Sequence, residues 1–131
     1  MNDKKWILTL TLVGLFALAF SACSSTADAP AQTVLLYHEA LVAKDQDRLI
    51  SHSCAAWELD ALLELDSFVS VETELVDVSC ETVSNEDGVA RVQCDGAISA
   101  SYDGEAREFP LAPRTFIVVE ENNEWRLCGY E

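Results

Sequence analysis

Residues Val71 to Tyr102 read "VETELVDVSCETVSNEDGVARVQCDGAISASY", and their apolar and polar side chains alternate with a period of two. This alternation is typical of β-strands that bury one face. "SNEDG", Ser84 to Gly88, interrupts it with residues that favour turns. We therefore predict a β-hairpin with strands over 71–83 and 89–102.

The chain after this hairpin continues the sheet. Asp103-Gly104 is a strong two-residue hairpin signal, and "EAREFPLAPRTFIVVE" follows it. Pro110 and Pro113 in that segment favour an edge strand or a bulge. "ENN" then turns the chain into the final "EWRLCGYE". These signals predict a four-stranded antiparallel meander.

The last strand has two candidate inner faces. A turn centred on Asn122 pairs Trp125 with Val119 and Leu127 with Ile117, which makes one face continuously apolar. The opposite face, with Phe116, Val118 and Cys128, is also apolar, and a bulge near Pro113 would exchange the two. We expect Trp125 and Leu127 to face the core.

The residues before the sheet carry a helical pattern. In "DAPAQTVLLYHEALVAKD", apolar residues recur every three or four positions behind Asp28, a candidate N-cap, and Pro30. A second helix is predicted to start at Asp45 or Asp47, and a third to cover "AAWELDALLEL". Helices followed by an antiparallel sheet define an α+β protein with its N-terminal helices packed on one face of the sheet.

Four cysteines lie in this α+β region and permit three disulfide pairings. A first hairpin centred on Asp87 places Cys80 opposite Cys94 on the same face, which leaves Cys54 for Cys128. Zinc is the alternative use of these residues, but there is no C-x-x-C pair. We predict the disulfides Cys80–Cys94 and Cys54–Cys128.

The N-terminus resembles a bacterial lipoprotein signal. Lys4 and Lys5 precede a 15-residue apolar run that is too short for a stable membrane span. Phe20-Ser21-Ala22-Cys23 then resembles a lipobox, with Phe20 in place of the usual Leu. The expected product carries a diacylglyceryl group on Cys23, and its localisation is the outer side of a bacterial cell membrane. An ordinary signal peptide that leaves Cys23 as a spare thiol is the alternative.

Composition narrows the possible partners. The 131-residue chain has 8 basic and 23 acidic residues, a net charge of −15, and this charge should repel nucleic acid. The acidic residues are scattered, and no calcium-loop motif occurs, so neither a metal nor a cofactor is expected. The division of the chain is then a signal peptide over 1–22, a lipid-anchored tether over 23–32 and one domain over 33–131.

The helical "QTVLLYHEALVAKDQDRLISHSCAAW" and the closing "FIVVEENNEWRLCGYE" resemble the nuclear transport factor two-like, cystatin-like superfamily, in particular its small bacterial lipoproteins. The resemblance covers residues 29–131 and lies in pattern more than in fixed motifs. It implies a curved, cone-like sheet wrapped around the long helix. In many relatives the mouth of the cone is a ligand pocket, and in some it is catalytic.

Five side chains are candidates for the inside of such a cone: Tyr37, His38, His52, Glu74 and Tyr102. Glu74 continues the inward set of the first hairpin and faces Ala100 in the predicted register. We take Tyr37, Glu74 and Tyr102 as weak pocket candidates, and both histidines as surface or rim residues. No nucleophile elbow, phosphate loop or zinc-protease motif is present, so no catalytic residue is assigned.

Three functions fit these observations. A lipid-anchored module outside the cytoplasm that binds a small ligand or an envelope partner agrees with the anchor, the tether and the disulfides. A pocketed isomerase-like or hydrolase-like enzyme would need Glu74 or His38 as a base inside the cone. A structural envelope protein would need neither.

Overall fold

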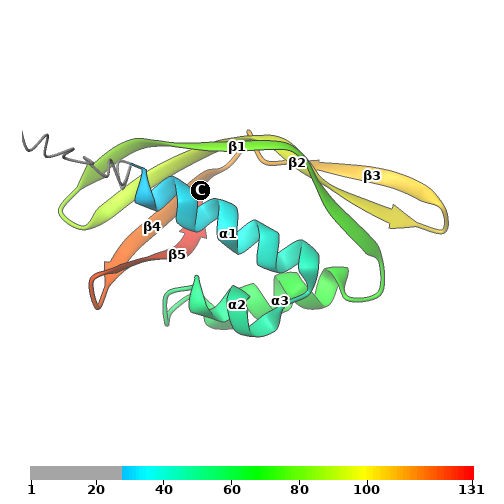
Figure 1. Cartoon of the computed structure of the whole chain (residues 1–131), viewed down its shortest axis with the longest axis horizontal. Coiled ribbons are helices and arrows are strands. Elements are labelled where there is room, and N and C mark those ends of the chain that lie inside the picture. Colours follow the sequence, from blue (N-terminus) through cyan, green and yellow to red (C-terminus); the bar gives the residue numbers. More distant parts are fainter. Residues whose placement is uncertain (1–27) are drawn as a thin grey trace, which may run out of the picture.

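The structure is a computed structural model, and it describes residues 28–131 (Figure 1). The predicted signal peptide and residues 23–27 of the tether, Cys23 included, lie outside these residues. The helices are α1 (Ala29–Ala43), α2 (Gln46–Ser51) and α3 (Glu58–Phe68). The strands are β1 (Glu72–Glu86), β2 (Val89–Tyr102), β3 (Glu105–Pro110), β4 (Thr115–Glu121) and β5 (Glu124–Tyr130).

The chain has the predicted α+β architecture. Figure 1 shows β1 and β2 arching over the helices, so that a curled antiparallel sheet forms a cone-like half-barrel with the helices on its inner face. The core fills the space between them. Its largest fully buried side chains are Tyr37, Phe116, Leu49, Leu111, Leu127, Val34, Val92, Val118 and Cys54. This arrangement agrees with the curved sheet that the resemblance implies.

Helix α1 begins earlier than the predicted domain boundary. Its N-cap is Asp28, and Pro30 lies in the first turn, where a missing N–H costs no helical hydrogen bond. The Asp28 carboxylate bonds to Thr82 of β1 instead of capping the helix. Residues 29–32, which we assigned to the tether, therefore belong to the domain, and Ala31 among them is buried.

The first hairpin has the predicted register only around its disulfide. Cys80 pairs with Cys94 as predicted. The register centred on Asp87 would also pair Val76 with Ile98, but in the structure Ile98 pairs with Leu75. The shift is a β-bulge, in which the segment 77–78 of β1 lies opposite the single residue Gly96. Both Asp77 and Gly96 have positive φ angles at this point.

The bulge reverses the faces of the N-terminal part of β1. Since side chains alternate along a strand, one extra residue turns Thr73 and Leu75 towards the helices and Glu74 towards solvent. Glu74 pairs with Ser99, not with Ala100, and its side chain is exposed. The prediction that Glu74 points into the cone is therefore wrong.

Gly96 should be the least replaceable glycine of the sheet. A Cβ atom there would lie 2.5 Å from the Val76 carbonyl oxygen and 2.6 Å from that of Asp77. Gly104 has the same φ of +85° but nothing within 4 Å of the corresponding position. We expect Gly96→Ala to lower the free energy of unfolding by about 3 kcal/mol and Gly104→Ala by about 1 kcal/mol. Urea unfolding measures both, and equal losses would contradict the crowding at the bulge.

The sheet has five strands, not the predicted four-stranded meander. β3 pairs with residues 97–102 of β2, and β4 pairs with residues 89–93 along the same edge. The chain leaves the sheet between them over residues 111–114, where Pro113 has no N–H to donate to a neighbouring strand. There the buried Leu111 turns inward, and its N–H donates to the Gly96 carbonyl at 3.0 Å.

The final hairpin differs from its predicted register by one residue. Asn122 and Asn123 both have positive φ angles and form a two-residue turn, so Leu127 pairs with Val118. Leu127 faces the core as expected, but Val118 and Phe116 are buried with it rather than on the opposite face. Trp125 also packs against the core, as expected, but its side chain is only half-buried.

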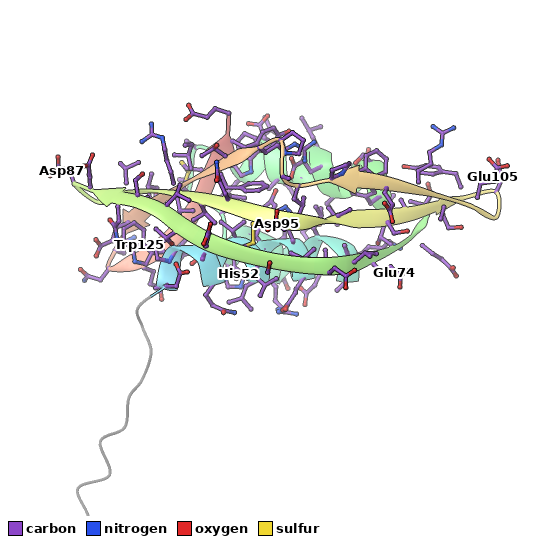
Figure 2. All side chains as sticks on the ribbon, turned by 90° about the horizontal axis from the view of Figure 1, so that it is seen from above. His52, Glu74, Asp87, Asp95, Glu105 and Trp125 are labelled. Carbon is purple, nitrogen blue, oxygen red and sulfur yellow. A yellow bond between two sulfur atoms is a disulfide. The ribbon has the colours of Figure 1, made fainter. Side chains whose placement is uncertain are left out.

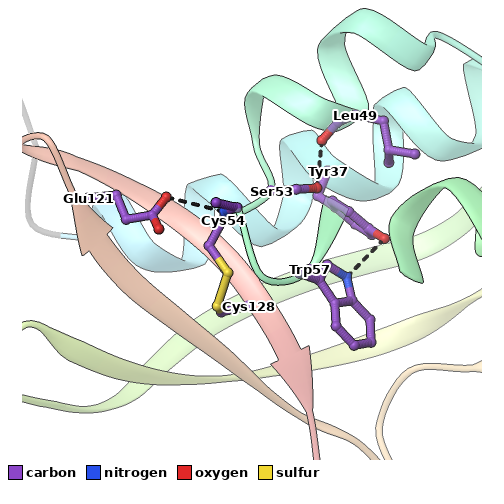
Figure 3. Close-up of a disulfide and its surroundings, with 8 residues drawn as sticks. Tyr37, Leu49, Ser53, Cys54, Trp57, Glu121 and Cys128 are labelled. Atoms are coloured by element: carbon purple, nitrogen blue, oxygen red, sulfur yellow. Dashed lines mark hydrogen bonds between the residues drawn. A yellow bond between two sulfur atoms is a disulfide. The ribbon is translucent and has the colours of Figure 1, made fainter. Parts of the chain in front are cut away.

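The structure contains the predicted disulfides, Cys54–Cys128 and Cys80–Cys94. The first requires the α2–α3 connection to reach the last strand. Residues 52–54 do this by pairing with β5: the Leu127 N–H donates to the His52 carbonyl at 2.7 Å, and the Cys54 N–H donates to the Leu127 carbonyl at 2.8 Å. Figure 3 shows Cys54 held against β5 beside Cys128.

Candidate functional site

A cavity of about 230 Å³ lies between the helices and the inner face of the sheet. Its lining combines apolar walls with a few polar groups drawn from α1, α3 and the C-terminal strands. The lining residues are Tyr37, His38, Leu41, Glu64, Ser67, Phe68, Ile98, Phe109, Arg114, Phe116, Leu127 and Tyr130. Concave apolar sites with a few convergent polar groups are the usual form of small-molecule sites.

Tyr37 occupies the apolar stripe of α1 and presents its hydroxyl to α3. The hydroxyl donates to Glu64 Oε2 at 2.6 Å and accepts a hydrogen bond from Trp57 Nε1 at 3.3 Å, as Figure 3 shows for Trp57. Burial, followed by the nearby Glu64 charge, raises the pKa of Tyr37 above its usual value of 10.0. Tyr37 thus stays protonated and fixes the orientation of the Glu64 carboxyl group.

Glu64 is a carboxyl group at the border of the core. It is half-buried, one turn after the fully buried Ala61 on α3. Burial raises its pKa, while the Tyr37 hydrogen bond and the charge of Arg114 act in the opposite direction. The carboxyl group of Glu64 therefore combines partial desolvation with a fixed geometry, a combination common in functional sites.

His38 is buried at 3% exposure, which corrects its assignment to the surface or rim. Its Nδ1 lies 2.8 Å from the Val34 carbonyl oxygen, and since a carbonyl only accepts, Nδ1 carries a proton. Its ring packs edge-to-face on Phe116 with a centroid distance of 5.0 Å. Burial lowers the pKa of His38 to about 4, so near neutral pH Nε2 has no proton and is an acceptor.

His38 should make the fold less stable in acid. Its pKa falls from 6.5 to about 4 on folding, so the unfolded chain binds more protons between these values. The stability that His38 contributes is fully present above pH 6.5 and is lost as the pH falls towards 4, by about 3 kcal/mol in total. We expect His38→Gln to remove this loss.

Urea unfolding of both proteins at a series of pH values between 7 and 4 measures the difference. Both proteins contain Glu64, whose raised pKa makes the fold more stable as the pH falls. The difference between their free energies of unfolding at each pH therefore isolates the contribution of His38. A constant difference across this range would contradict the burial of a neutral His38.

Arg114 brings a positive charge to the cavity. It lies just before β4 and is half-buried, with its guanidinium carbon 4.6 Å from the centroid of the Tyr130 ring. Within residues 28–131, the arginine ion pairs are Arg48–Glu39, Arg91–Glu131 and Arg126–Glu124. Arg114 is in none of them.

Of the three pocket candidates, only Tyr37 lines this cavity. Glu74 lies on the outer side of β1, as Figure 2 shows, where it lines a separate depression together with Ser99 and Ser101. Tyr102 is half-buried at the far end of β2, and its ring centroid is 5.9 Å from the Arg107 guanidinium carbon. Neither side chain belongs to the site.

Two charged residues of the cavity were missing from the sequence-based candidates. Glu64 lies next to Leu65 and three residues after Ala61, so helical spacing places it at the edge of the buried face of α3. This spacing was available in the sequence. Arg114 had no such signal, because its position depends on how the chain turns between β3 and β4.

Over residues 28–131, no helix is long and apolar enough to cross a membrane. The same residues contain no group of three or more His, Cys, Asp or Glu side chains arranged to hold a metal ion.

Comparison with known proteins finds a likeness among solved structures. No family model and no curated protein matches the chain. A solved structure named as a variant of Rd1NTF2_05 is similar at 16% sequence identity, with a TM-score of 0.45, over 82% of this chain and 97% of that one. The fold class assigned above, helices on a curled antiparallel sheet, comes from the topology itself.

Proposed function

We propose that this chain is a lipid-anchored module of the nuclear transport factor two-like superfamily that binds a small ligand outside the cytoplasm. One observation carries the proposal: the space between the helices and the curled sheet contains an apolar cavity into which Tyr37, His38, Glu64 and Arg114 converge. An interior that served stability alone would be filled by apolar side chains at close packing.

The dimensions of the cavity favour a small ligand. Its volume of about 230 Å³ is below the range of roughly 300–1,000 Å³ that is usual for drug-sized molecules. Phe68, Phe109 and Ile98 form apolar walls that would hold a hydrocarbon or aromatic group. The polar groups would orient the remainder of the molecule.

Binding without catalysis is the form of the proposal that the described residues favour. Glu74, one of the two bases considered for an enzyme, lies on the outer face of the sheet. His38 lines the cavity, but burial lowers its pKa to about 4, which makes it a weak base at neutral pH. The functional groups are thus suited to holding a molecule.

Thermal unfolding in the presence of a metabolite panel tests the binding. A ligand that binds only the folded state raises the midpoint, and the increase grows with the ratio of the free ligand concentration to Kd. Ser67 is exposed and lines the cavity, so Ser67→Trp should obstruct it without disturbing the core. The neighbouring exposed Asp66 does not line the cavity, and Asp66→Trp is the matched control.

We expect at least one compound to raise the midpoint of the native protein and of Asp66→Trp but not of Ser67→Trp. Absence of stabilisation across the panel, or equal stabilisation of both variants, would contradict a ligand site in this cavity. The structural envelope role would then be the better account.

The anchor is tested separately at Cys23. We expect the native protein to fractionate with membranes and to carry acyl mass on Cys23, and Cys23→Ala to be released. A Cys23→Ala protein that stays in the membrane fraction would contradict the lipidation.

A further inference from the structure

The cavity is lined by one acidic and one basic side chain that form no ion pair with each other. Glu64 comes from α3, and Arg114 comes from the β3–β4 connection. Within residues 28–131, neither side chain takes part in an ion pair, so the two charges are not in direct contact. Two opposite charges that line one apolar cavity without pairing are suited to a ligand that carries both.

We infer that the ligand is a small apolar zwitterion, with its carboxylate on Arg114 and its ammonium group on Glu64. This inference rests on the proposed function. The apolar part of the ligand would lie against Phe68, Phe109 and Ile98, and the whole has the chemistry of a free amino acid with an apolar side chain.

Arg114 has the features of a carboxylate-binding residue. A chain with a net charge of −15 repels anions over most of its surface, so an anionic group needs a local cation to bind. Contact with the Tyr130 ring positions the guanidinium group, whose planar fork matches two carboxylate oxygens. The absence of a carboxylate partner for Arg114 among the described residues keeps this fork available.

Glu64 has the features of an ammonium-binding residue. The Tyr37 hydroxyl donates to Oε2 of its carboxyl group and holds the group in place, and the remaining lone pairs of a carboxylate can accept hydrogen bonds from a ligand ammonium group. His38 Nε2, an acceptor near neutral pH, lines the same cavity. The acidic surface also attracts a molecule through its cationic end before it enters.

Four probes that share one aromatic ring separate the contributions of the ligand's two charges to binding. Phenylalanine has both charges, 3-phenylpropionate has only the carboxylate, 2-phenylethylamine has only the ammonium group, and 2-phenylethanol has neither. Isothermal titration calorimetry at pH 7 would give the Kd of each for the native protein, Arg114→Met and Glu64→Gln. Arg107→Met is the control, because Arg107 also lies over a tyrosine ring but does not line the cavity. Circular dichroism establishes that each variant is folded, and Arg114→Lys and Glu64→Asp replace any that is not.

We expect phenylalanine to bind the native protein about tenfold more tightly than either singly charged probe. Arg114→Met should weaken the binding of phenylalanine and 3-phenylpropionate by about tenfold and leave the binding of 2-phenylethylamine unchanged. Glu64→Gln should weaken the binding of phenylalanine and 2-phenylethylamine by about tenfold and leave that of 3-phenylpropionate unchanged. Arg107→Met should change none of them.

Equal binding of 2-phenylethanol and phenylalanine would overturn the inference and leave the proposed function intact, because the cavity would then bind its ligand without using the charges. Tighter binding of 3-phenylpropionate than of phenylalanine would also overturn it, in favour of an anionic ligand. Failure of all four probes to bind would overturn the inference, while the proposed function would still be decided by the broader panel and Ser67→Trp.

Discussion

Replacing both Cys54 and Cys128 with alanine should lower the free energy of unfolding by about 4–5 kcal/mol. The bridge joins residues 74 positions apart, and its loss would release the loop-closure entropy of that long segment in the unfolded chain. It would also weaken the docking of residues 52–54 on β5, which continues into the core through Leu127. Urea unfolding under oxidising conditions measures the loss.

The second disulfide is the matched control. Cys80 and Cys94 are only 14 positions apart, so their double replacement with alanine should cost about 3 kcal/mol. A larger loss at Cys80–Cys94 than at Cys54–Cys128 would contradict this account of how β5 is held. Peptide mapping without reduction should recover the same two pairs from the native protein.

Replacing Phe116 with alanine should cost about 4 kcal/mol. Phe116 is 1% exposed, packs edge-to-face on His38 and Tyr130, and closes one side of the cavity. Its loss would remove a large buried apolar surface and leave a cavity that the surrounding strands cannot fill.

Phe109 is the control of the same residue type. It also lines the cavity, but it is half-buried on β3, where it packs against Phe68. We expect Phe109→Ala to cost about half as much as Phe116→Ala, as measured by chemical unfolding. Equal costs would contradict the position of Phe116 at the centre of the core.

The fold class could be predicted because local patterns agreed with the tertiary structure. The change of period from 3.6 to 2 separated helices from strands, and turn residues such as Asp103-Gly104 marked the hairpins. The Cys80–Cys94 pair followed from the same reasoning, since it lies within the part of the hairpin where the register is regular.

The errors arose where the backbone departs from regular geometry. The bulge opposite Gly96 reversed the face of Glu74, and nothing in the alternation of the strand fixes its position. The break at Pro113 was read as a bulge but separates two strands, which brings Arg114 to the cavity. Periodicity describes which face a residue occupies within one element, whereas the site is assembled from two helices, four strands and the β3–β4 connection.

The most direct test of the central claim is an NMR titration of the isotopically labelled protein with phenylalanine, because it shows where the ligand binds. The account predicts saturable chemical-shift changes at the side chains of Tyr37, Phe116 and Arg114, which line the cavity. Glu74, on the outer face of the sheet, should not change. Shifts confined to the outer face, or none at the cavity residues up to millimolar phenylalanine, would contradict it.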